Sequence, residues 1–384
     1  MKALLQNFKT GEMTIENVPS PALKKEGVLV KNISSLVSAG TEKAIIELAK
    51  MNLLEKAIAR PDLVKKVLEK SGQDGLLATA SIVKNLISAP LPLGYSSSGI
   101  IYKVGSQVGD LKPEQKVACA GIGYANHAEM IYVPRNLLVP VPDNLSYEEA
   151  AFVTIGSIAL QGFRQSELLL GETVVVLGLG LVGNITAQLC QAAGCSVFGL
   201  DIDQSKVKLA KKIGINNSFL ISNDIVQKIQ KFTNNRGVDA VIITAATKSS
   251  DPVNLAPKLL RDRGKVVALG DIGHNIPRRE YYEKEIDLRQ SRSYGPGRYD
   301  MQYEEKGNDY PIGYVRWTEN RNMEAFIKMI SERKIDVKSL ISHRYKLVDA
   351  INGYELLAGS KKEKYNGIII NYSLKKESQD EKIN

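Results

Sequence analysis

One stretch of this 384-residue chain, from Glu172 to Asp201, constrains the fold more strongly than any other. The β-prone residues Thr173 to Leu177 lead directly into the sequence GLGLVG, which ends at Gly183. Apolar residues at helical spacing follow as far as Gly194, and a second apolar run ends in Asp201. A strand, a glycine turn, a helix, a strand and an acid in this order are typical of a dinucleotide-binding βαβ unit.

Each residue of this stretch has a chemical reason to be there. The first glycine permits a tight turn, the second lets the backbone approach a pyrophosphate, and the third lets helix and strand pack closely. The helix N-terminus presents free N–H groups and a positive dipole end to the phosphates. Asp201 can accept hydrogen bonds from a ribose diol and would repel a 2′-phosphate, so the sequence predicts NAD(H) rather than NADP(H). The expected cofactor-binding residues here are Gly178, Gly180, Leu181, Val182, Gly183 and Asp201.

Composition limits the remaining classes of protein. The length and the hydrophobic content of 43% predict two domains with a large core. The net charge of +9 comes from Lys and Arg scattered among acids, which favours a solvated basic surface over nucleic-acid binding. A pocket that attracts an anionic sugar or sugar nucleotide is the alternative explanation. No signal peptide and no run of about 20 apolar residues is present, so we expect a cytoplasmic protein with no membrane partner.

The pattern changes along the chain on both sides of the glycine-rich stretch. Residues 1–37 alternate like short strands, residues 43–89 have helical spacing, and the strand pattern returns from residue 93. After Asp201, strands and helices alternate, which predicts a parallel sheet with ligands at the carboxyl ends of its strands. Ala245 and Gly270 lie at two such ends and should border the cofactor. Lys206 either reaches the adenosine ribose or lies on a solvated face. A last strand over 285–293 and a helix over 323–334 are also predicted.

Several short sequences occur in an order that resembles a known superfamily. They are Gly94-Tyr95-Ser96, Gly99, Val104-Gly105, Lys116-Val117-Ala118, His127-Ala128-Glu129-Met130 and Pro140-Val141-Pro142. The order is similar to that of medium-chain dehydrogenases/reductases and extends over nearly the whole chain. This resemblance implies an α/β protein with a doubly wound Rossmann sheet and a GroES-like β-barrel substrate domain. The implied limits are 1–149 for the barrel part with a helical insert at 43–89, 150–315 for the NAD-binding domain, 316–372 for the segment that completes the substrate domain, and 373–384 for a disordered tail.

Other stretches narrow the resemblance. The helical insert, LPLGYSSSG and SYGPGRYD are similar to the dehydrogenase half of bacterial bi-domain oxidoreductases of polysaccharide biosynthesis. That resemblance implies a second oxidoreductase domain or subunit as a partner, and we also expect a homo-oligomer.

The departures from the superfamily pattern concern zinc. Ala39 stands at the position of the ligand cysteine, and Tyr95-Ser96 stand where a histidine and glutamate are expected. The lobe that would hold four structural cysteines has only Cys119, and three histidines in the chain cannot supply the set. The sequence therefore predicts no metal site.

Without zinc, a side chain must polarise the carbonyl or take the alcohol proton. Thr41 matches a proton-relay position of the zinc members, and Tyr95 carries a phenol that can donate to an oxygen. His127 stands where members of the resembled superfamily usually have a bulky apolar residue. Each has a structural alternative: Thr41 as a helix cap, Tyr95 as a buried ring with one hydrogen bond, and His127 as a satisfied buried histidine.

The segment after the last predicted strand offers candidate substrate contacts. Arg298 is expected to clamp a carboxylate or phosphate, and Tyr294 to offer a ring and a hydroxyl to a sugar. A turn that merely needs glycine and proline explains the same residues. The sequence as a whole predicts a zinc-independent, NAD(H)-dependent oxidoreductase acting on a secondary alcohol or ketone of a sugar or nucleotide-sugar. The alternative function is a non-catalytic NAD(H)-binding module that partners a second oxidoreductase domain.

Overall fold

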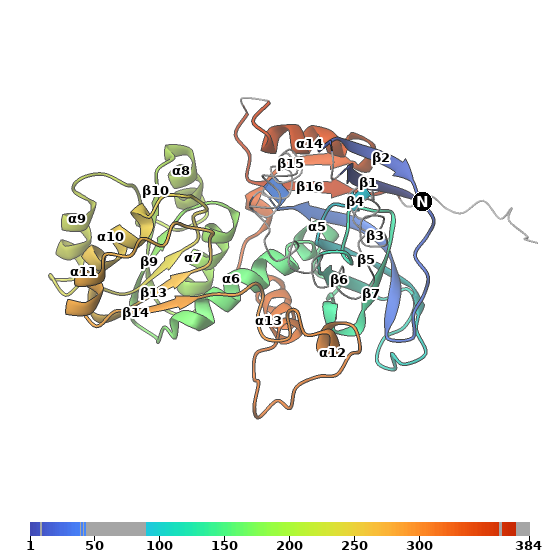
Figure 1. Ribbon diagram of the computed structural model, residues 1–384, viewed down its shortest axis with the longest axis horizontal. Coiled ribbons are helices and arrows are strands. Elements are labelled where there is room, and N and C mark those ends of the chain that lie inside the picture. The colour runs from blue at the N-terminus through green and yellow to red at the C-terminus, as the bar shows by residue number, and fades with distance from the viewer. Residues whose placement is uncertain (8–9, 39, 41, 44–89, 361–362, 374–384) are drawn as a thin grey trace, which may run out of the picture.

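The computed structural model describes residues 1–7, 10–38, 40, 42–43, 90–360 and 363–373. Two lobes, one around a parallel sheet and one around a barrel-like sheet, are joined through the helix α6, Val153–Ser166 (Figure 1). The predicted insert at 43–89 lies outside the described residues except for Lys43, and so does the tail beyond Ser373. No helix of the described part is long and apolar enough to cross a membrane.

The parallel sheet has six strands in the order β11-β10-β9-β12-β13-β14. This is the doubly wound order in which two βαβ halves diverge from a central pair of strands. The strands are β9 Thr173–Leu177, β10 Ser196–Asp201, β11 Ser218–Leu220, β12 Val238–Ile243, β13 Leu260–Ala268 and β14 Asp287–Gln290. The helices are α7 Leu181–Ala192, α8 Gln204–Lys212, α9 Ile225–Phe232, α10 Asp251–Leu259 and α11 Arg278–Glu283.

The apolar strand β9 is buried on both faces, which explains its unbroken run of β-branched residues. Val174 and Val176 pack with Ala187 of α7 on one face. Val175 packs with Val253 of α10 on the other. The predicted helix-covered parallel sheet is therefore present.

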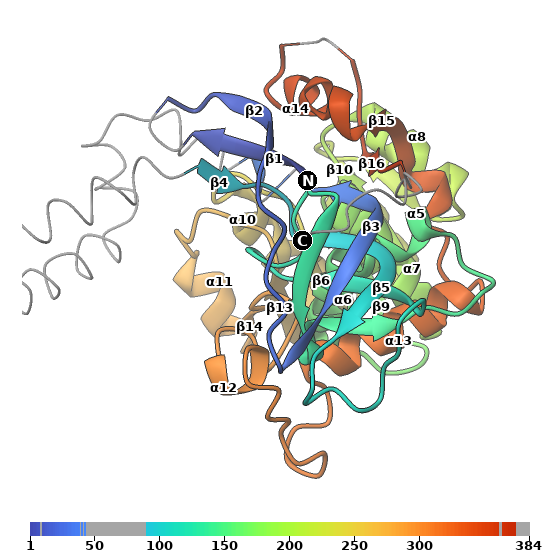
Figure 2. The same ribbon diagram turned by 90° about the vertical axis from the view of Figure 1, so that its right-hand side faces the viewer.

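The second lobe is built from both ends of the chain. The eleven-residue strand β3 pairs with β5, β7 and β16, so the last strand returns beside an early one. Its strands are β1 Lys2–Asn7, β2 Met13–Asn17, β3 Gly27–Val37, β4 Pro90–Pro92, β5 Ser96–Val104, β6 Lys116–Ala120, β7 Met130–Pro134, β8 Leu138–Pro140, β15 Ile341–Lys346 and β16 Gly367–Asn371. Its helices are α5 Tyr147–Ala150, α12 Met301–Glu304, α13 Glu319–Ser331 and α14 Ala350–Leu357, with the 3-10 turns η1 Arg135–Leu137, η2 Lys338–Leu340 and η3 Leu347–Asp349. Figure 2 shows β1, β2 and β4 together at one edge of this lobe, where they form a sheet of three strands.

Helix α6 touches both lobes because two of its residues are glycines. A Cβ at Gly156 would lie 2.0 Å from the Phe326 ring of α13, and one at Gly162 would lie 2.3 Å from Leu269 after β13. Close approach of α6 on both sides thus requires the absence of a side chain at these positions.

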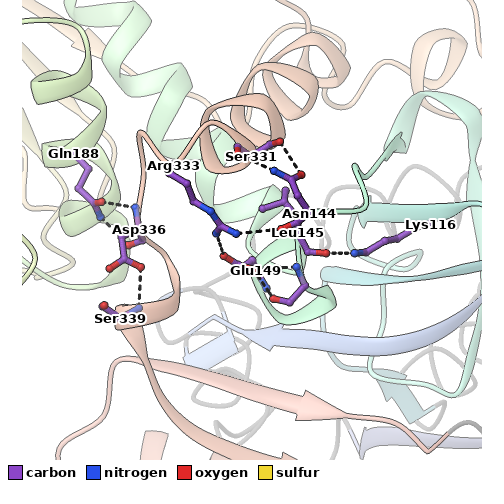
Figure 3. Close-up of polar contacts among 10 residues, drawn as sticks. Lys116, Asn144, Leu145, Glu149, Gln188, Ser331, Arg333, Asp336 and Ser339 are labelled. Atoms are coloured by element: carbon purple, nitrogen blue, oxygen red, sulfur yellow. Dashed lines mark hydrogen bonds and ion pairs between the residues drawn. The ribbon is translucent and has the colours of Figure 1, made fainter.

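Polar contacts also fix the joint between the lobes (Figure 3). Gln188 of α7 donates to the backbone carbonyl of Asp336 at 3.1 Å and accepts from its N–H at 2.7 Å. Beside this contact, and within the second lobe, Arg333 donates to Glu149 of α5 at 2.5 Å. Every group named here has a partner, so this joint is a satisfied polar contact.

Two predicted element boundaries were wrong. The last strand of the parallel sheet covers Asp287–Gln290 rather than 285–293. Helix α13 begins at Glu319, not at residue 323, because Thr318 caps it by accepting a hydrogen bond from the Arg321 N–H.

Candidate active site

The glycine loop between β9 and α7 forms an open backbone cradle. Gly178 has a φ of +98°, and a Cβ at Gly183 would lie 1.8 Å from the Gly178 carbonyl oxygen. Gly180 is the N-cap of α7, and a Cβ there would meet nothing within 4 Å. The loop therefore needs glycine for its own shape at two positions and leaves space above the third, as binding of a pyrophosphate to the helix N-terminus requires.

Asp201 lies at the end of β10 and is hydrogen-bonded to this loop. Its Oδ2 accepts from the Leu179 N–H at 2.6 Å, and its Oδ1 accepts from the Asp203 N–H at 2.8 Å. The carboxylate is half-buried and retains lone pairs for a diol, since each oxygen can accept more than one hydrogen bond.

Ala245 and Gly270 meet the glycine loop at the carboxyl ends of neighbouring strands. The Ala245 N–H donates to the Leu177 carbonyl at 3.1 Å. A Cβ at Gly270 would lie 1.8 Å from the Ala245 carbonyl oxygen, and one at Gly178 would lie 2.7 Å from the Ala245 nitrogen. The structure thus brings the loop, Ala245 and Gly270 together at one edge of the sheet.

Lys206 is partly buried and contacts the other lobe, and its contact with an adenosine ribose stays a prediction. Its Nζ donates to the Tyr365 carbonyl at 2.7 Å and lies 3.5 Å from the Asn366 Oδ1. Burial lowers the pKa of this ammonium, while Asp201 and Asp203 oppose that change. Lys364 pairs with Asp203 at 3.1 Å, so two lysines connect the lobes beside Asp201.

Tyr95 precedes β5 and is buried, with 4% of its surface exposed. Its hydroxyl donates to Ser38 Oγ at 2.6 Å. Its carbonyl accepts from the Gly121 N–H and from Thr154 Oγ1, each at 3.0 Å. These contacts match the structural alternative for Tyr95, and its role in proton transfer remains a proposal.

His127 packs against Gly94, the residue before Tyr95, because a Cβ at Gly94 would be 2.8 Å from the imidazole ring. The imidazole is fully buried, and its Nδ1 is hydrogen-bonded to Ser35 Oγ at 2.7 Å. Ser35 Oγ is in turn hydrogen-bonded to the Tyr372 hydroxyl at 2.7 Å. The histidine thus belongs to a buried polar network that connects β3 with the end of the described chain.

Glu42 completes this network. Its Oε1 accepts from the Ser38 N–H at 2.9 Å, and its Oε2 accepts from the Tyr354 hydroxyl. Glu42 Oε2 also lies 3.4 Å from His127 Nε2, although this nitrogen has no hydrogen bond of good geometry among the described residues. Burial, and then the charge of Glu42, raise the pKa of the Tyr354 phenol. Thr41, the remaining catalytic candidate, lies outside the described residues.

The two candidate substrate residues are near each other in the loop after β14. The Arg298 guanidinium is 5.5 Å from the Tyr294 ring centroid. Arg298 Nη1 donates to Glu304 Oε1 at 2.5 Å, and the two side chains are 10% and 9% exposed. The charge of Arg298 is therefore already balanced by a carboxylate, which weakens its expected use as an anion clamp.

Comparisons with known proteins agree with this architecture. A family model described as zinc-binding dehydrogenase matches residues 182–305, less than half of the chain. Sorbitol dehydrogenase 1 of Saccharomyces cerevisiae is 25% identical over 340 residues, covering 78% of this chain and 88% of that protein. Alcohol dehydrogenase TADH from Thermus sp. ATN1 has a TM-score of 0.69 at 18% identity and covers 97% and 100% of the two chains. Galactitol-1-phosphate dehydrogenase from Escherichia coli has a TM-score of 0.71 at 18% identity, with the same coverage.

The chain therefore has the fold of these dehydrogenases, with a Rossmann domain and a GroES-like domain, and the predicted fold class is confirmed. The chain is similar to alcohol and polyol dehydrogenases.

Tyr95 and Ser96, at two of the expected ligand positions, do not fit the zinc that the matching family's description implies. The Tyr95 hydroxyl is bonded to Ser38, and Ser96 Oγ donates to the Ala151 carbonyl at 2.6 Å. Zinc prefers thiolate, imidazole and carboxylate ligands. Within the described ranges, no three His, Cys, Asp or Glu side chains gather as a metal site would require. Ala39 lies outside those ranges.

Sequence reasoning missed Glu42, Glu304 and Glu319. Glu42 directly follows Thr41, and the sequence pattern indicated a role only for Thr41 at this position, as a proton relay or a helix cap. The other two are acids in stretches with many charged residues, and only burial distinguishes them from solvated acids.

Proposed function

We propose that this protein is an NAD(H)-dependent oxidoreductase that interconverts a secondary alcohol and a ketone of a polyol or sugar, and does so without zinc. The observation that supports this most directly is the glycine cradle with Asp201 bonded to its Leu179 N–H. The N–H groups at the start of α7 would hold the pyrophosphate, and Asp201 the adenosine ribose. Ala245 and Gly270 border the strand ends where the nicotinamide half would lie. A bound nicotinamide supplies or accepts the hydride.

The chain must supply the proton that accompanies the hydride. We propose Tyr95 as the donor to the carbonyl oxygen, with the hydrogen-bonded Ser38 as its neighbour in a proton path. The backbone N–H of Ser38 contacts Glu42, which fixes Ser38 relative to the buried network around His127. In this proposal His127 and Glu42 are positioning residues, since neither is exposed.

The test is a spectroscopic assay of NADH oxidation and NAD⁺ reduction with a panel of ketoses and polyols. We expect turnover with at least one pair, and a loss of roughly 100-fold or more in kcat for Tyr95→Phe, within the range for general acid–base catalysis. The variant should retain NADH affinity. If Tyr95→Phe has the same kcat as the wild-type protein, Tyr95 is not the proton donor.

A non-catalytic NAD(H)-binding module remains the second candidate, favoured by the burial of both Tyr95 and His127. NADH binding by calorimetry, without turnover of any ketose or polyol alone or with added partner proteins from the same gene neighbourhood, would favour it.

We also propose that the oxidoreductase is a cytoplasmic homo-oligomer that acts in the synthesis of a surface polysaccharide. Deletion of the gene should then alter the monosaccharide composition of the cell-surface polysaccharide.

A further inference from the structure

Tyr294, Arg298 and Glu319 form one side-chain cluster at the start of α13, since Arg298 lies over the Tyr294 ring and both interact electrostatically with Glu319. Four buried polar atoms of this cluster have no hydrogen-bond partner among the described residues. They are Tyr294 Oη, Arg298 Nε and both carboxylate oxygens of Glu319. Tyr294 is 3% exposed and Glu319 is fully buried. Leaving such a group unsatisfied costs about 1–3 kcal/mol, so several in one place indicate that a polar group from outside the chain binds here.

The backbone that carries this cluster is strained at the same place. Ser293 and Tyr299 have φ values of 53° and 69°, in the left-handed region that side chains disfavour. They flank Gly295 and Gly297, which also have positive φ. The loop is held by α13, because the Glu319 N–H donates to the Pro296 carbonyl at 2.8 Å. Strain of this kind persists where the surrounding structure fixes it, often at ligand sites.

The charges of the cluster favour an uncharged ligand. Arg298 is paired with Glu304 at 2.5 Å, so the two together carry no net charge. Burial, with the nearby charge of Glu304, raises the pKa of Glu319 to about 9, so this carboxyl is protonated at neutral pH. An anion bound here would face Glu304 without an unpaired cation to balance it. A hydroxyl group can instead accept from Arg298 Nε–H and from protonated Glu319, and can donate to Tyr294.

The cluster is connected to the candidate active site along α6. Thr154 near the start of this helix contacts Tyr95, and Gln161 accepts from Asn322 Nδ2 at 3.3 Å. The same Asn322 amide donates to the Tyr294 carbonyl at 3.0 Å. The seven-residue separation of Thr154 and Gln161 corresponds to about 10 Å along the helix axis.

We propose that Tyr294, Arg298 and Glu319 form a buried binding site for an uncharged hydroxyl group, and that this site holds a hydroxyl of the polyol-class substrate in preference to a phosphate or carboxylate. The inference rests on the proposed function for the identity of that substrate. It replaces the expected anion clamp at Arg298 with recognition of a neutral group.

The experiment compares Glu319→Gln with Glu319→Leu in the NAD(H)-bound protein. Gln keeps an uncharged donor and acceptor, whereas Leu has a similar size and neither. Calorimetry would measure the affinities for sorbitol, xylitol and their phosphates, with circular dichroism to verify folding. We expect wild type to prefer the unphosphorylated polyols, Glu319→Gln to remain within about threefold, and Glu319→Leu to lose roughly tenfold, the equivalent of one hydrogen bond. Tyr294→Phe provides a second variant with an expected loss of similar size.

The outcomes separate this inference from the proposed function. Tighter binding of the phosphates, no binding of any polyol by wild type, or equal polyol binding by wild type and Glu319→Leu overturns the site. If wild type and Glu319→Leu bind polyols equally and Glu319→Leu also has a larger free energy of unfolding, the cluster holds water only. If Glu319→Leu turns over a polyol with an unchanged KM, the proposed oxidoreductase function is supported and the proposed hydroxyl site is wrong. If the variants bind polyols in the expected order but wild type shows no turnover, the hydroxyl site is supported and the proposed enzymatic activity is wrong.

Discussion

The glycine loop after β9 and the cluster beside α13 prepare for a ligand in opposite ways. The loop uses backbone N–H groups and the absence of side chains, all within one turn between a strand and a helix. The cluster uses buried side chains from the loop after β14 and from α13, and four of their polar atoms have no hydrogen-bond partner among the described residues. A backbone site is specified by where side chains are missing, so adding one methyl group should damage it. A side-chain site is specified by protonation and hydrogen bonds, so it should respond to pH and to isosteric replacement.

The largest effect is expected in the loop, from Gly183→Ala. The added Cβ would lie 1.8 Å from the Gly178 carbonyl oxygen, so the loop must move and NADH binding should be lost. The clash should also lower stability by about 1–3 kcal/mol, as overpacking usually does. Gly180→Ala is the matched control, because its Cβ meets nothing within 4 Å. It should retain the wild-type melting temperature and still weaken NADH binding by calorimetry. Unchanged NADH affinity in Gly180→Ala would contradict the placement of the pyrophosphate.

The next effect concerns cofactor choice at Asp201. Repulsion of a 2′-phosphate and lost ribose hydrogen bonds should favour NADH over NADPH by on the order of 2–4 kcal/mol, or roughly 30–1,000-fold. Asp201→Asn keeps an acceptor for the Leu179 N–H but removes the charge. It should reduce the preference by at least about tenfold in fluorescence titrations. Equal affinities of the wild-type protein for the two cofactors would show that Asp201 has been assigned wrongly.

A smaller effect is expected at His127, in the buried polar network of the second lobe. His127→Ala removes one of the two hydrogen-bond partners of Ser35 Oγ and leaves Glu42 buried without the nearby imidazole. A loss of about 1–3 kcal/mol in the free energy of unfolding follows, measured with urea. Arg279→Ala, which removes an exposed ion pair with Glu283, is the control and should unfold like wild type. If both variants unfold alike, the network has no structural importance.

The smallest effect, counted per pH unit, is a dependence of the free energy of unfolding on pH that comes from Glu319. Its pKa is about 9 in the folded protein and 4.5 ordinarily. Between these values the unfolded chain has released the proton while the folded one keeps it, so stability falls as pH rises. The slope is at most about 1.4 kcal/mol per pH unit, and Glu319→Gln should lack this contribution. Urea unfolding at two pH values within that window should show the stability of wild type falling relative to the variant. If the free energies of unfolding of wild type and Glu319→Gln differ by the same amount at both pH values, the Glu319 carboxyl is ionised in the folded protein.

These two regions also differ in how far the sequence predicts them. The cofactor loop was predicted residue by residue, because a tight turn and a helix start are local properties of a short stretch. The doubly wound sheet followed from the alternation of strands and helices. Helix α13 was placed to start at residue 323, although Thr318 is a capping residue that indicates the true start at Glu319. The burial of Glu319 has no local signal, since it results from the packing of the loop after β14 against α13.

Hydride transfer without zinc can be tested by metal analysis of the active protein. Zinc per chain would be measured by elemental analysis together with ketose reduction by NADH, before and after treatment with a strong chelator. We expect substoichiometric zinc and the same turnover in both samples. One zinc per chain, lost on chelation together with the activity and restored with it on adding zinc back, would contradict the account.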